Sequence, residues 1–181
     1  MDFKLPKLNI EGLKLFHSPP FSDERGYFRE LFRKSEIIQA GFLKEFVQDN
    51  FSLSQKNVLR GLHFQKKPKT QAKIIRVIEG RVWDVVVDLR FKSPTFGKWQ
   101  GVELSEQNGL GLLVPEEFAH GFLVLSDQAK VVYKNTHEYA PLFESGIIWN
   151  DPILNINWPV KNPIVSSKDL LLPKFNSIDY F

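Results

Sequence analysis

The chain has 181 residues, of which 43% are hydrophobic, so it is long enough to bury a substantial core in one compact domain. The net charge is only +3, and no basic tail or zinc-finger spacing indicates a nucleic-acid partner. Because the chain has no cysteine, disulfides, thiolate metal ligands and cysteine nucleophiles are excluded.

The N-terminal 20 residues mix charged and apolar side chains and contain no signal-peptide core. No other stretch approaches the roughly 18 consecutive apolar residues that a membrane span needs. We therefore expect a cytoplasmic protein without a membrane partner.

The predicted secondary structure is one short helix followed mostly by strands. The helix follows Phe32, with Ser35 as its N-cap and Gly41 as its C-terminal stop. Two strands rich in β-branched residues, 73–78 and 81–89, are joined by a tight turn. Further strands are expected at residues 100–104, 110–114, 121–125 and 129–135.

Short strands separated by turn residues favour an all-β sandwich or barrel. We expect a single domain over residues 1–181, with its barrel core at about residues 45–140. The remaining segment, 141–181, contains prolines at positions 141, 152, 159, 163 and 173, which disfavour regular structure. We expect this proline-rich segment to wrap around the barrel surface.

His63 lies in a segment, residues 60–65, where polar and apolar side chains alternate. On a strand, Gly61, His63 and Gln65 face one side and the apolar side chains face the other. A barrel interior lined by histidine and glutamine instead of aliphatic side chains favours a binding site. The alternative is a buried histidine that is hydrogen-bonded to a neighbour for purely structural reasons.

Four further polar positions have both a functional and a structural interpretation. Gln48 and Asn50 share one face of a strand, and they either hydrogen-bond a ligand or end an edge strand. Arg25, in a turn, either clamps a phosphate or is a solvated loop residue. Lys73, on an otherwise apolar strand, is either an edge residue or a cation that points into a cavity.

The four histidines do not form the ligand set of a metal-binding barrel of the cupin type. Such a site needs two histidines one residue apart, a carboxylate and a later histidine. His17, His63, His120 and His137 are scattered instead, so we expect no metal. Phosphate-binding loops of the Walker or dinucleotide type are absent from the sequence as well.

Several ordered segments together resemble the dTDP-4-dehydrorhamnose 3,5-epimerase family, from about residue 21 to residue 169. Many members of that family have histidine at the position of Phe51, a difference that concerns substrate detail more than the chemistry. The segments that carry the resemblance are 23–28 (DERGYF), 48–50 (QDN), 58–65 (VLRGLHFQ), 84–90 (DVVVDLR), 93–97 (SPTFG), 118–122 (FAHGF), 133–134 (YK), 149–152 (WNDP) and 167–169 (SKD).

The resemblance implies a mainly β fold, a cupin-like jelly-roll barrel with a few short peripheral helices, without a metal and usually assembled as a homodimer. It implies an isomerase that epimerises C3 and C5 of dTDP-4-dehydro-6-deoxy-D-glucose. The product would be dTDP-4-dehydro-L-rhamnose, for the biosynthesis of dTDP-L-rhamnose and cell-surface polysaccharide. No redox cofactor is implied, because the reaction involves no net oxidation.

The resemblance also assigns roles to individual residues. His63 is the base, since imidazole titrates near neutral pH, and Asp169 pairs with it and fixes its tautomer. Tyr133 is the acid on the opposite face of the sugar, and Lys73 holds the C4 oxygen and stabilises the enolate. Tyr139 stacks on the thymine ring. The residues implied to bind the nucleotide and the sugar are Arg25, Phe28, Glu30, Gln48, Asp49, Asn50, Arg60, Lys73, His120, Tyr139, Glu144 and Lys168.

Two alternatives remain at the level of the sequence. The first is a C3-only or C5-only epimerase, or a 3,4-ketoisomerase, that acts on a related nucleotide-linked 4-keto-6-deoxysugar. The second is a non-catalytic sugar- or nucleotide-binding module, which has no need of the His63, Tyr133 and Lys73 set. Measured turnover, and the position of deuterium in the product, distinguish these alternatives.

Overall fold

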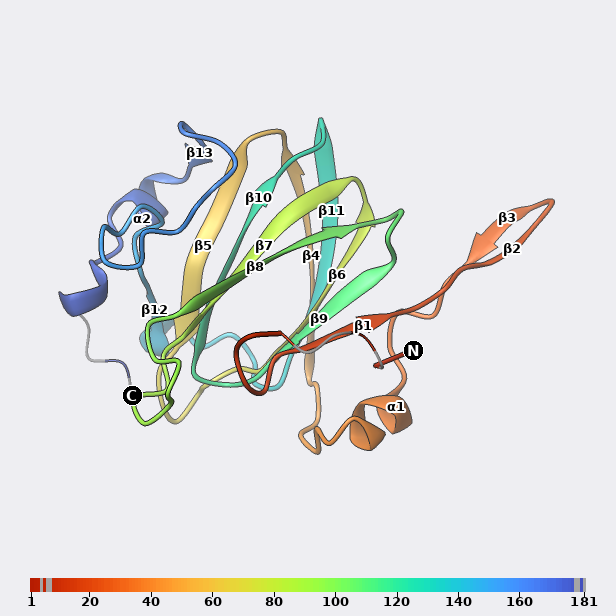
Figure 1. Cartoon of the computed structure of the whole chain (residues 1–181), viewed down its shortest axis with the longest axis horizontal. Coiled ribbons are helices and arrows are strands. Elements are labelled where there is room, and N and C mark those ends of the chain that lie inside the picture. Colours follow the sequence, from red (N-terminus) through yellow and green to blue (C-terminus); the bar gives the residue numbers. More distant parts are fainter. Residues whose placement is uncertain (4, 6–7, 178–179, 181) are drawn as a thin grey trace.

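The computed structural model describes residues 1–3, 5, 8–177 and 180. These residues form a mainly β, jelly-roll fold in which two large sheets pack face to face (Figure 1). A small hairpin stands apart from both sheets, and the C-terminal segment lies against the outside of one of them. The predicted fold class is therefore confirmed.

The first sheet contains five strands of the described chain and ends at β4, which is an edge strand. All of its neighbouring strands are antiparallel. In spatial order it consists of β1 (Lys14–His17), β9 (Leu110–Val114), β6 (Lys73–Glu79), β11 (Gln128–Asn135) and β4 (Gln48–Gln55).

The second sheet runs in the order β12, β5, β10, β7, β8, and β13 pairs with β5 in parallel. The separate hairpin is formed by β2 (Phe21–Asp23) and β3 (Gly26–Phe28). The strands of the second sheet are β12 (Glu144–Gly146), β5 (Val58–Gln65), β10 (Phe118–Val124), β7 (Arg81–Asp88), β8 (Trp99–Ser105) and β13 (Ile164–Val165).

The helices are short and lie at the periphery. They are α1 (Lys34–Gln39), α2 (Ser167–Leu170), and the 3-10 turns η1 (Pro141–Phe143) and η2 (Phe175–Ser177). Within the described residues, none of them is long and apolar enough to cross a membrane.

The helix predicted after Phe32 is present as α1, but the prediction of Ser35 as its N-cap is wrong. The extended N-cap residue is Arg33, whose side chain binds the carboxylates of Glu30 and Glu36, so Ser35 falls inside the first turn. Gly41 has φ of +86° just after the helix, as expected for a helix stop.

The main core fills the space between the two sheets. Alternate residues of each strand point into it, among them Ile75 and Val77 of β6 and Val82 and Val86 of β7. A second cluster covers the outer face of the second sheet, where Phe175 and other side chains of the C-terminal segment pack on the strands. Both faces of β7 are therefore buried, which explains its nearly continuous run of valines.

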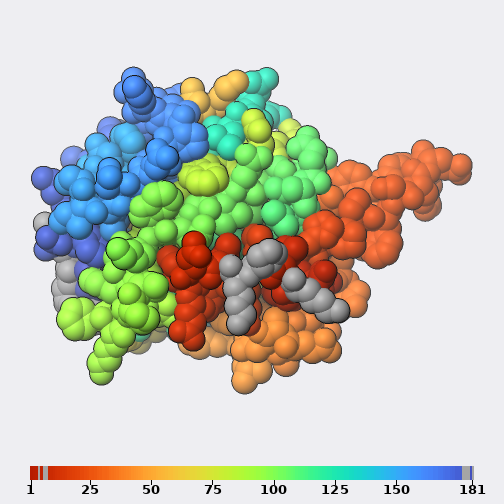
Figure 2. Space-filling model, in the orientation of Figure 1, coloured from red at the N-terminus to blue at the C-terminus, as the bar shows by residue number. Residues whose placement is uncertain are grey.

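The β2–β3 hairpin projects from the body of the molecule, and its aromatic side chains have little cover from the rest of the chain (Figure 2). Phe21 and Phe28 are 67% and 68% exposed. Large exposed apolar groups gathered on one projecting element are typical of a surface that contacts another molecule.

Gly61 marks a close approach of β5 and β10. Its φ is +127°, and a Cβ atom at this position would lie 2.5 Å from the Cα atom of Gly121. Gly61→Ala should therefore lower the free energy of unfolding by about 3 kcal/mol, measured by urea or thermal unfolding. Gly41→Ala is the control, because Gly41 also has positive φ but has open space around its Cα. Equal losses of stability in the two variants would contradict this account.

Candidate active site

At one end of the space between the sheets, polar and charged side chains join the apolar ones. Two adjoining cavities, of about 150 Å³ and 770 Å³, open there and share His63, Lys73 and Tyr133. The strands that bear these residues are β5, β6 and β11, so both sheets contribute to the same cavities.

His63 is bound to Asp169, a residue 106 positions away in the sequence. The distance from His63 Nε2 to Asp169 Oδ1 is 2.8 Å. Asp169 lies in α2, which the parallel pairing of β13 with β5 brings alongside His63. Ser166 caps α2 by accepting the Asp169 N–H at 3.0 Å, and Asp169 Oδ2 accepts the Gly61 N–H at 3.2 Å.

The state of Asp169 follows from these contacts. Burial is the largest single influence on the pKa of its carboxyl and raises it. The hydrogen bond and charge of His63, together with the hydrogen bonds to Gly61 and Ser166, jointly outweigh burial, so the pKa lies below its ordinary value. An ionised carboxylate only accepts hydrogen bonds, so His63 Nε2 carries the hydrogen and Nδ1 is left as the ring's acceptor. This is the arrangement that a general base requires.

Tyr133 approaches the same cavities from the opposite sheet. It lies on β11, opposite Asn50 of β4 and Ile75 of β6, and it is half-buried. Burial raises the pKa of its phenol, and the nearby Arg60 only partly opposes this effect. The hydroxyl is therefore protonated at neutral pH and is able to donate a proton into the cavity.

Lys73 begins β6 and is only 8% exposed. Burial lowers the pKa of its ammonium group to about 8, while the negative charges of Asp84 and Glu144 act in the opposite direction. In the described part of the chain its Nζ atom has neither a hydrogen bond nor an ion pair, although it lines both cavities. Of the two interpretations of Lys73, the structure favours the cation that points into a cavity.

The rim of the smaller cavity is a hydrogen-bonded frame. Glu144 Oε2 accepts from Tyr139 Oη at 2.5 Å and from Lys168 Nζ at 2.6 Å. Gln48 Oε1 accepts the Tyr139 N–H at 2.6 Å, and its amide donates to Asn50 Oδ1 at 2.9 Å. These contacts join β4, β12, α2 and the segment before η1 around the cavity entrance.

The structure brings most of the residues expected in the site together. His120 and Arg60 line the larger cavity, and Arg60 Nε donates to Ser54 Oγ at 2.9 Å. The residues that line one or both cavities are Gln48, Asn50, Arg60, His63, Lys73, His120, Tyr133, Tyr139, Glu144, Lys168 and Asp169.

Four residues expected in the site lie elsewhere in this chain. Arg25 and Phe28 are on the projecting hairpin, where Arg25 binds Asp23 at 2.6 Å. Glu30 binds Arg33 at 2.6 Å. Asp49 is on β4 but faces away from the two cavities and pairs with Lys134 at 2.6 Å. Strand alternation explains Asp49, because its neighbours Gln48 and Asn50 face the cavities.

Several polar side chains at the site were not expected there from the sequence. Gln71 and Asn135 line the smaller cavity, and Asp84 binds His120 from behind the larger one. The available signal for Asp84 was a carboxylate on a strand rich in valine. Among the described residues, no three histidine, aspartate or glutamate side chains form a group that could hold a metal.

Comparisons with known proteins agree with this fold. A family model described as dTDP-4-dehydrorhamnose 3,5-epimerase matches residues 7–177. The enzyme of that name from Shigella flexneri is 51% identical over 176 residues, which cover 97% of each chain.

Solved structures are also similar. The dTDP-4-dehydrorhamnose 3,5-epimerase from Bacillus anthracis, with TDP and PPi bound, is 46% identical with a TM-score of 0.91, over 95% of this chain and 99% of that one. The dTDP-6-deoxy-D-glucose-3,5-epimerase from Legionella pneumophila, in complex with dTDP-4-keto-L-rhamnose, is 45% identical with a TM-score of 0.92, over 95% and 92%.

Fold, site and similarity together define a jelly-roll isomerase of nucleotide-linked sugars. The chain belongs to the dTDP-4-dehydrorhamnose 3,5-epimerase family.

The lowered pKa of Asp169 leads to a prediction about acid stability. A carboxyl with a depressed pKa stabilises the fold above its unfolded pKa, near 4, and loses this effect as the pH falls through its folded pKa. The stability advantage of the wild type over Asp169→Asn should therefore shrink between about pH 5 and pH 3 in urea unfolding. Asp127→Asn, at a side chain 97% exposed, is the control and should show no such change. A difference between wild type and Asp169→Asn that is constant with pH would be evidence against the ionised pair.

Proposed function

We propose that the protein converts dTDP-4-dehydro-6-deoxy-D-glucose into dTDP-4-dehydro-L-rhamnose by inverting C3 and C5, a step in dTDP-L-rhamnose biosynthesis. One observation carries this proposal: the His63–Asp169 pair and the Tyr133 phenol reach the same cavity from opposite sheets, beside the buried ammonium group of Lys73. The bound dTDP-4-keto-L-rhamnose in the similar Legionella structure supports a substrate of this class.

The chemistry depends on the ketone at C4. The protons on C3 and C5 are acidic because their removal gives an enolate, whose negative charge lies on the C4 oxygen. His63 Nδ1 takes the proton, the C–H electron pair forms the C=C bond, and Tyr133 Oη returns a proton to the opposite face of the ring. Solvent then reprotonates the phenolate and deprotonates the imidazolium. A positioned acid and base each contribute about 10²- to 10⁴-fold in rate.

Lys73 is assigned to the C4 oxygen. Its buried ammonium group has no protein partner among the described residues, so it is free to bind the enolate oxygen. In a cavity shielded from water, a charge aimed at a developing oxyanion contributes several kcal/mol to the transition state. The reaction leaves the oxidation level of the sugar unchanged, so the proposal requires no redox cofactor.

The rest of the site is assigned to substrate binding. Arg60 and Lys168 supply positive charge for the diphosphate, and Gln48, Asn50 and His120 supply hydrogen bonds for the sugar. The half-exposed ring of Tyr139 at the entrance is suited to stack on thymine.

We also propose a single cytoplasmic domain over residues 1–181 that acts as a homodimer. The exposed hairpin carries Arg25 and Phe28, and the edge strand β4 next to the cavities exposes Phe51 by 60% and Leu53 by 46%. Seating the hairpin of one subunit against β4 of the other buries both apolar surfaces. It also brings Arg25, Phe28 and Glu30 to the partner's cavity, where the sequence resemblance assigns them to substrate binding.

The reaction itself is tested with purified protein and dTDP-4-dehydro-6-deoxy-D-glucose in deuterated water. A double epimerase should incorporate deuterium at both C3 and C5, detected by proton NMR, and a reductase partner should then yield dTDP-L-rhamnose. Label at only one carbon would identify a single-centre epimerase, and a 3-keto product would identify a ketoisomerase. Binding without turnover would identify a binding module, and any of these three results overturns the proposal.

His63→Ala and Tyr133→Phe should each reduce net epimerisation by at least about 10²-fold while the thermal unfolding temperature stays close to the wild-type value. Tyr133→Phe should still exchange substrate protons with solvent deuterium, because the base is intact. His17→Ala is the matched control, since His17 lies on β1, away from both cavities, and should keep full activity. Wild-type rates in either active-site variant would disprove the assignment of base and acid.

A mixing experiment tests the dimer. An Arg25→Ala/Phe28→Ala variant and a His63→Ala variant should each be nearly inactive, but refolding them together should restore activity. One site of each mixed dimer then combines an intact cavity with an intact hairpin from the other subunit. His63→Ala mixed with Tyr133→Phe should stay inactive, because each cavity of the mixed dimer then carries one of the two changes and neither is intact. Full activity of the hairpin variant alone, or a monomer by light scattering, would refute the arrangement.

A further inference from the structure

Asp84 is a carboxylate buried at the end of the apolar core. It lies on β7 between Val82 and Val86, which face the space between the sheets, and all three residues are completely buried. A buried carboxylate costs several kcal/mol unless its oxygens are well paired. Packing alone does not account for a carboxylate buried at this cost in free energy behind the active-site cavity.

The partners of Asp84 satisfy only one of its oxygens. Oδ2 accepts from His120 Nε2 at 2.9 Å. Oδ1 is buried and has no hydrogen-bond partner in the described part of the structure. Part of the negative charge of Asp84 is therefore not neutralised by hydrogen bonds.

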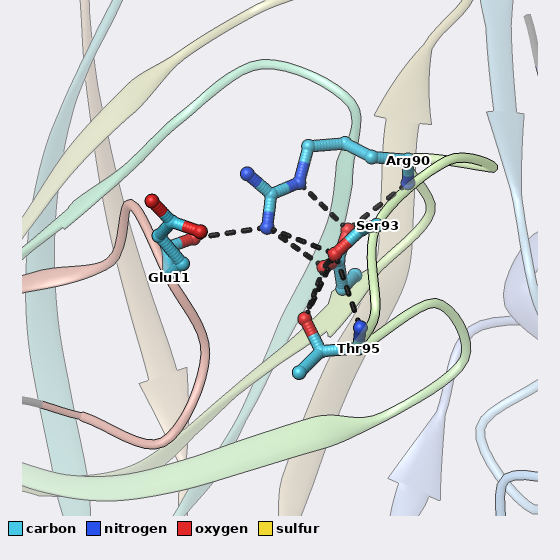
Figure 3. A network of polar contacts seen from close by, with 5 residues as sticks. Glu11, Arg90, Ser93 and Thr95 are labelled. Carbon is cyan, nitrogen blue, oxygen red and sulfur yellow. Dashed lines mark hydrogen bonds and ion pairs between the residues drawn. The ribbon is translucent and has the colours of Figure 1, made fainter.

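Asp88 provides a contrast on the same strand and the same face. It is also completely buried, but its two oxygens accept hydrogen bonds from Arg90, Ser93 and Thr95 at distances between 2.6 and 3.0 Å (Figure 3). The loop that follows β7 thus satisfies Asp88 completely. Asp88 has a structural role, whereas Asp84 has charge left to act on the cavity.

Lys73 is the cation on which this charge acts. Burial is the main influence on the pKa of Lys73 and lowers it, while Asp84 is the largest influence in the opposite direction, ahead of Glu144. The other charged or titratable groups that line the cavities with Lys73 are His63 on β5, Tyr133 on β11, His120 on β10, Arg60 on β5, Tyr139 before η1, Glu144 on β12, and Lys168 and Asp169 on α2. None of these is both negatively charged and buried in the apolar core behind the cavity, as Asp84 is.

We propose that Asp84 is a positioning residue that keeps the Lys73 ammonium group charged within the cavity and fixes the orientation of the His120 ring. This inference rests on the function proposed above and adds Asp84, which acts through Lys73 and His120. Because Asp84 accepts the Nε2 hydrogen of His120, the acceptor nitrogen of the neutral ring is Nδ1. A substrate hydroxyl group therefore meets an acceptor at His120 and a donor at Lys73.

The test is Asp84→Asn, which keeps the shape and an oxygen that still accepts from His120, but removes the charge. The kcat should fall by about tenfold to a hundredfold while KM changes less than about threefold, since the enolate is bound more strongly than the ketone. The alkaline limb of the kcat/KM profile, near pH 8 in the wild type, should move down by about one pH unit or more. The ammonium group loses its proton more readily once the nearby negative charge is gone.

Two variants separate this role from a structural one. Asp88→Asn removes a carboxylate from the same strand and should lower stability without moving the alkaline limb. On a Lys73→Arg background, Asp84→Asn should not move the limb, because a guanidinium group stays charged throughout this range. An alkaline limb of Asp84→Asn that coincides with the wild-type limb would overturn the proposal.

A measurement on the wild type covers the case in which Asp84→Asn fails to fold. The carboxyl carbon of Asp84, followed by ¹³C NMR, should show a titration step near pH 8 that is absent in Lys73→Arg. A carboxyl chemical shift that stays constant around pH 8 in the wild type would contradict the coupling between Asp84 and Lys73. These results are distinct from failure of the proposed function, in which the wild type itself would not convert the substrate.

Discussion

The cost of burying charge at one end of an apolar sandwich is the constraint on which this structure depends. Between the sheets, valine, leucine and isoleucine side chains form a continuous core, but its end holds the ammonium of Lys73 and the carboxylate of Asp84. Charges in such a place persist only when opposite charges and hydrogen bonds offset their desolvation. Two carboxylate–histidine pairs supply such hydrogen bonds in the site, Asp169 with His63 and Asp84 with His120.

The jelly-roll topology supplies these pairs from distant parts of the chain. The proposed base comes from the second sheet and the proposed acid from the first, so the width of the sandwich separates them across the cavity. Inverting a stereocentre needs proton transfer at both faces of the sugar ring. A cavity between two sheets has two opposing walls, so that one wall carries the base and the other carries the acid.

Period-two alternation predicted the strands and the facing of His63, Gln48 and Asn50, because each sheet has one face on the core. The pairing of Asp169 with His63 was predicted only from the family resemblance. The parallel pairing of β13 with β5, which brings the two residues together, has no signature in the local sequence. Arg25 and Phe28 lie on the hairpin outside the cavities, because a turn motif in the sequence does not say where in the fold that turn is placed. Asp84 was missed since both faces of β7 are buried, which removes the alternation that would have marked it.

The short helix α2 has a consequence for how the enzyme loses activity on heating. It spans four residues near the C-terminus, and its side-chain cap is a single bond to Ser166, while the strands of each sheet are joined by long ladders of backbone hydrogen bonds. Opening of this terminal segment costs far less than global unfolding, so it is a local event. Moderate heating would therefore abolish the enzymatic activity while the two sheets are still folded. The activity would return on cooling when the C-terminal segment docks again.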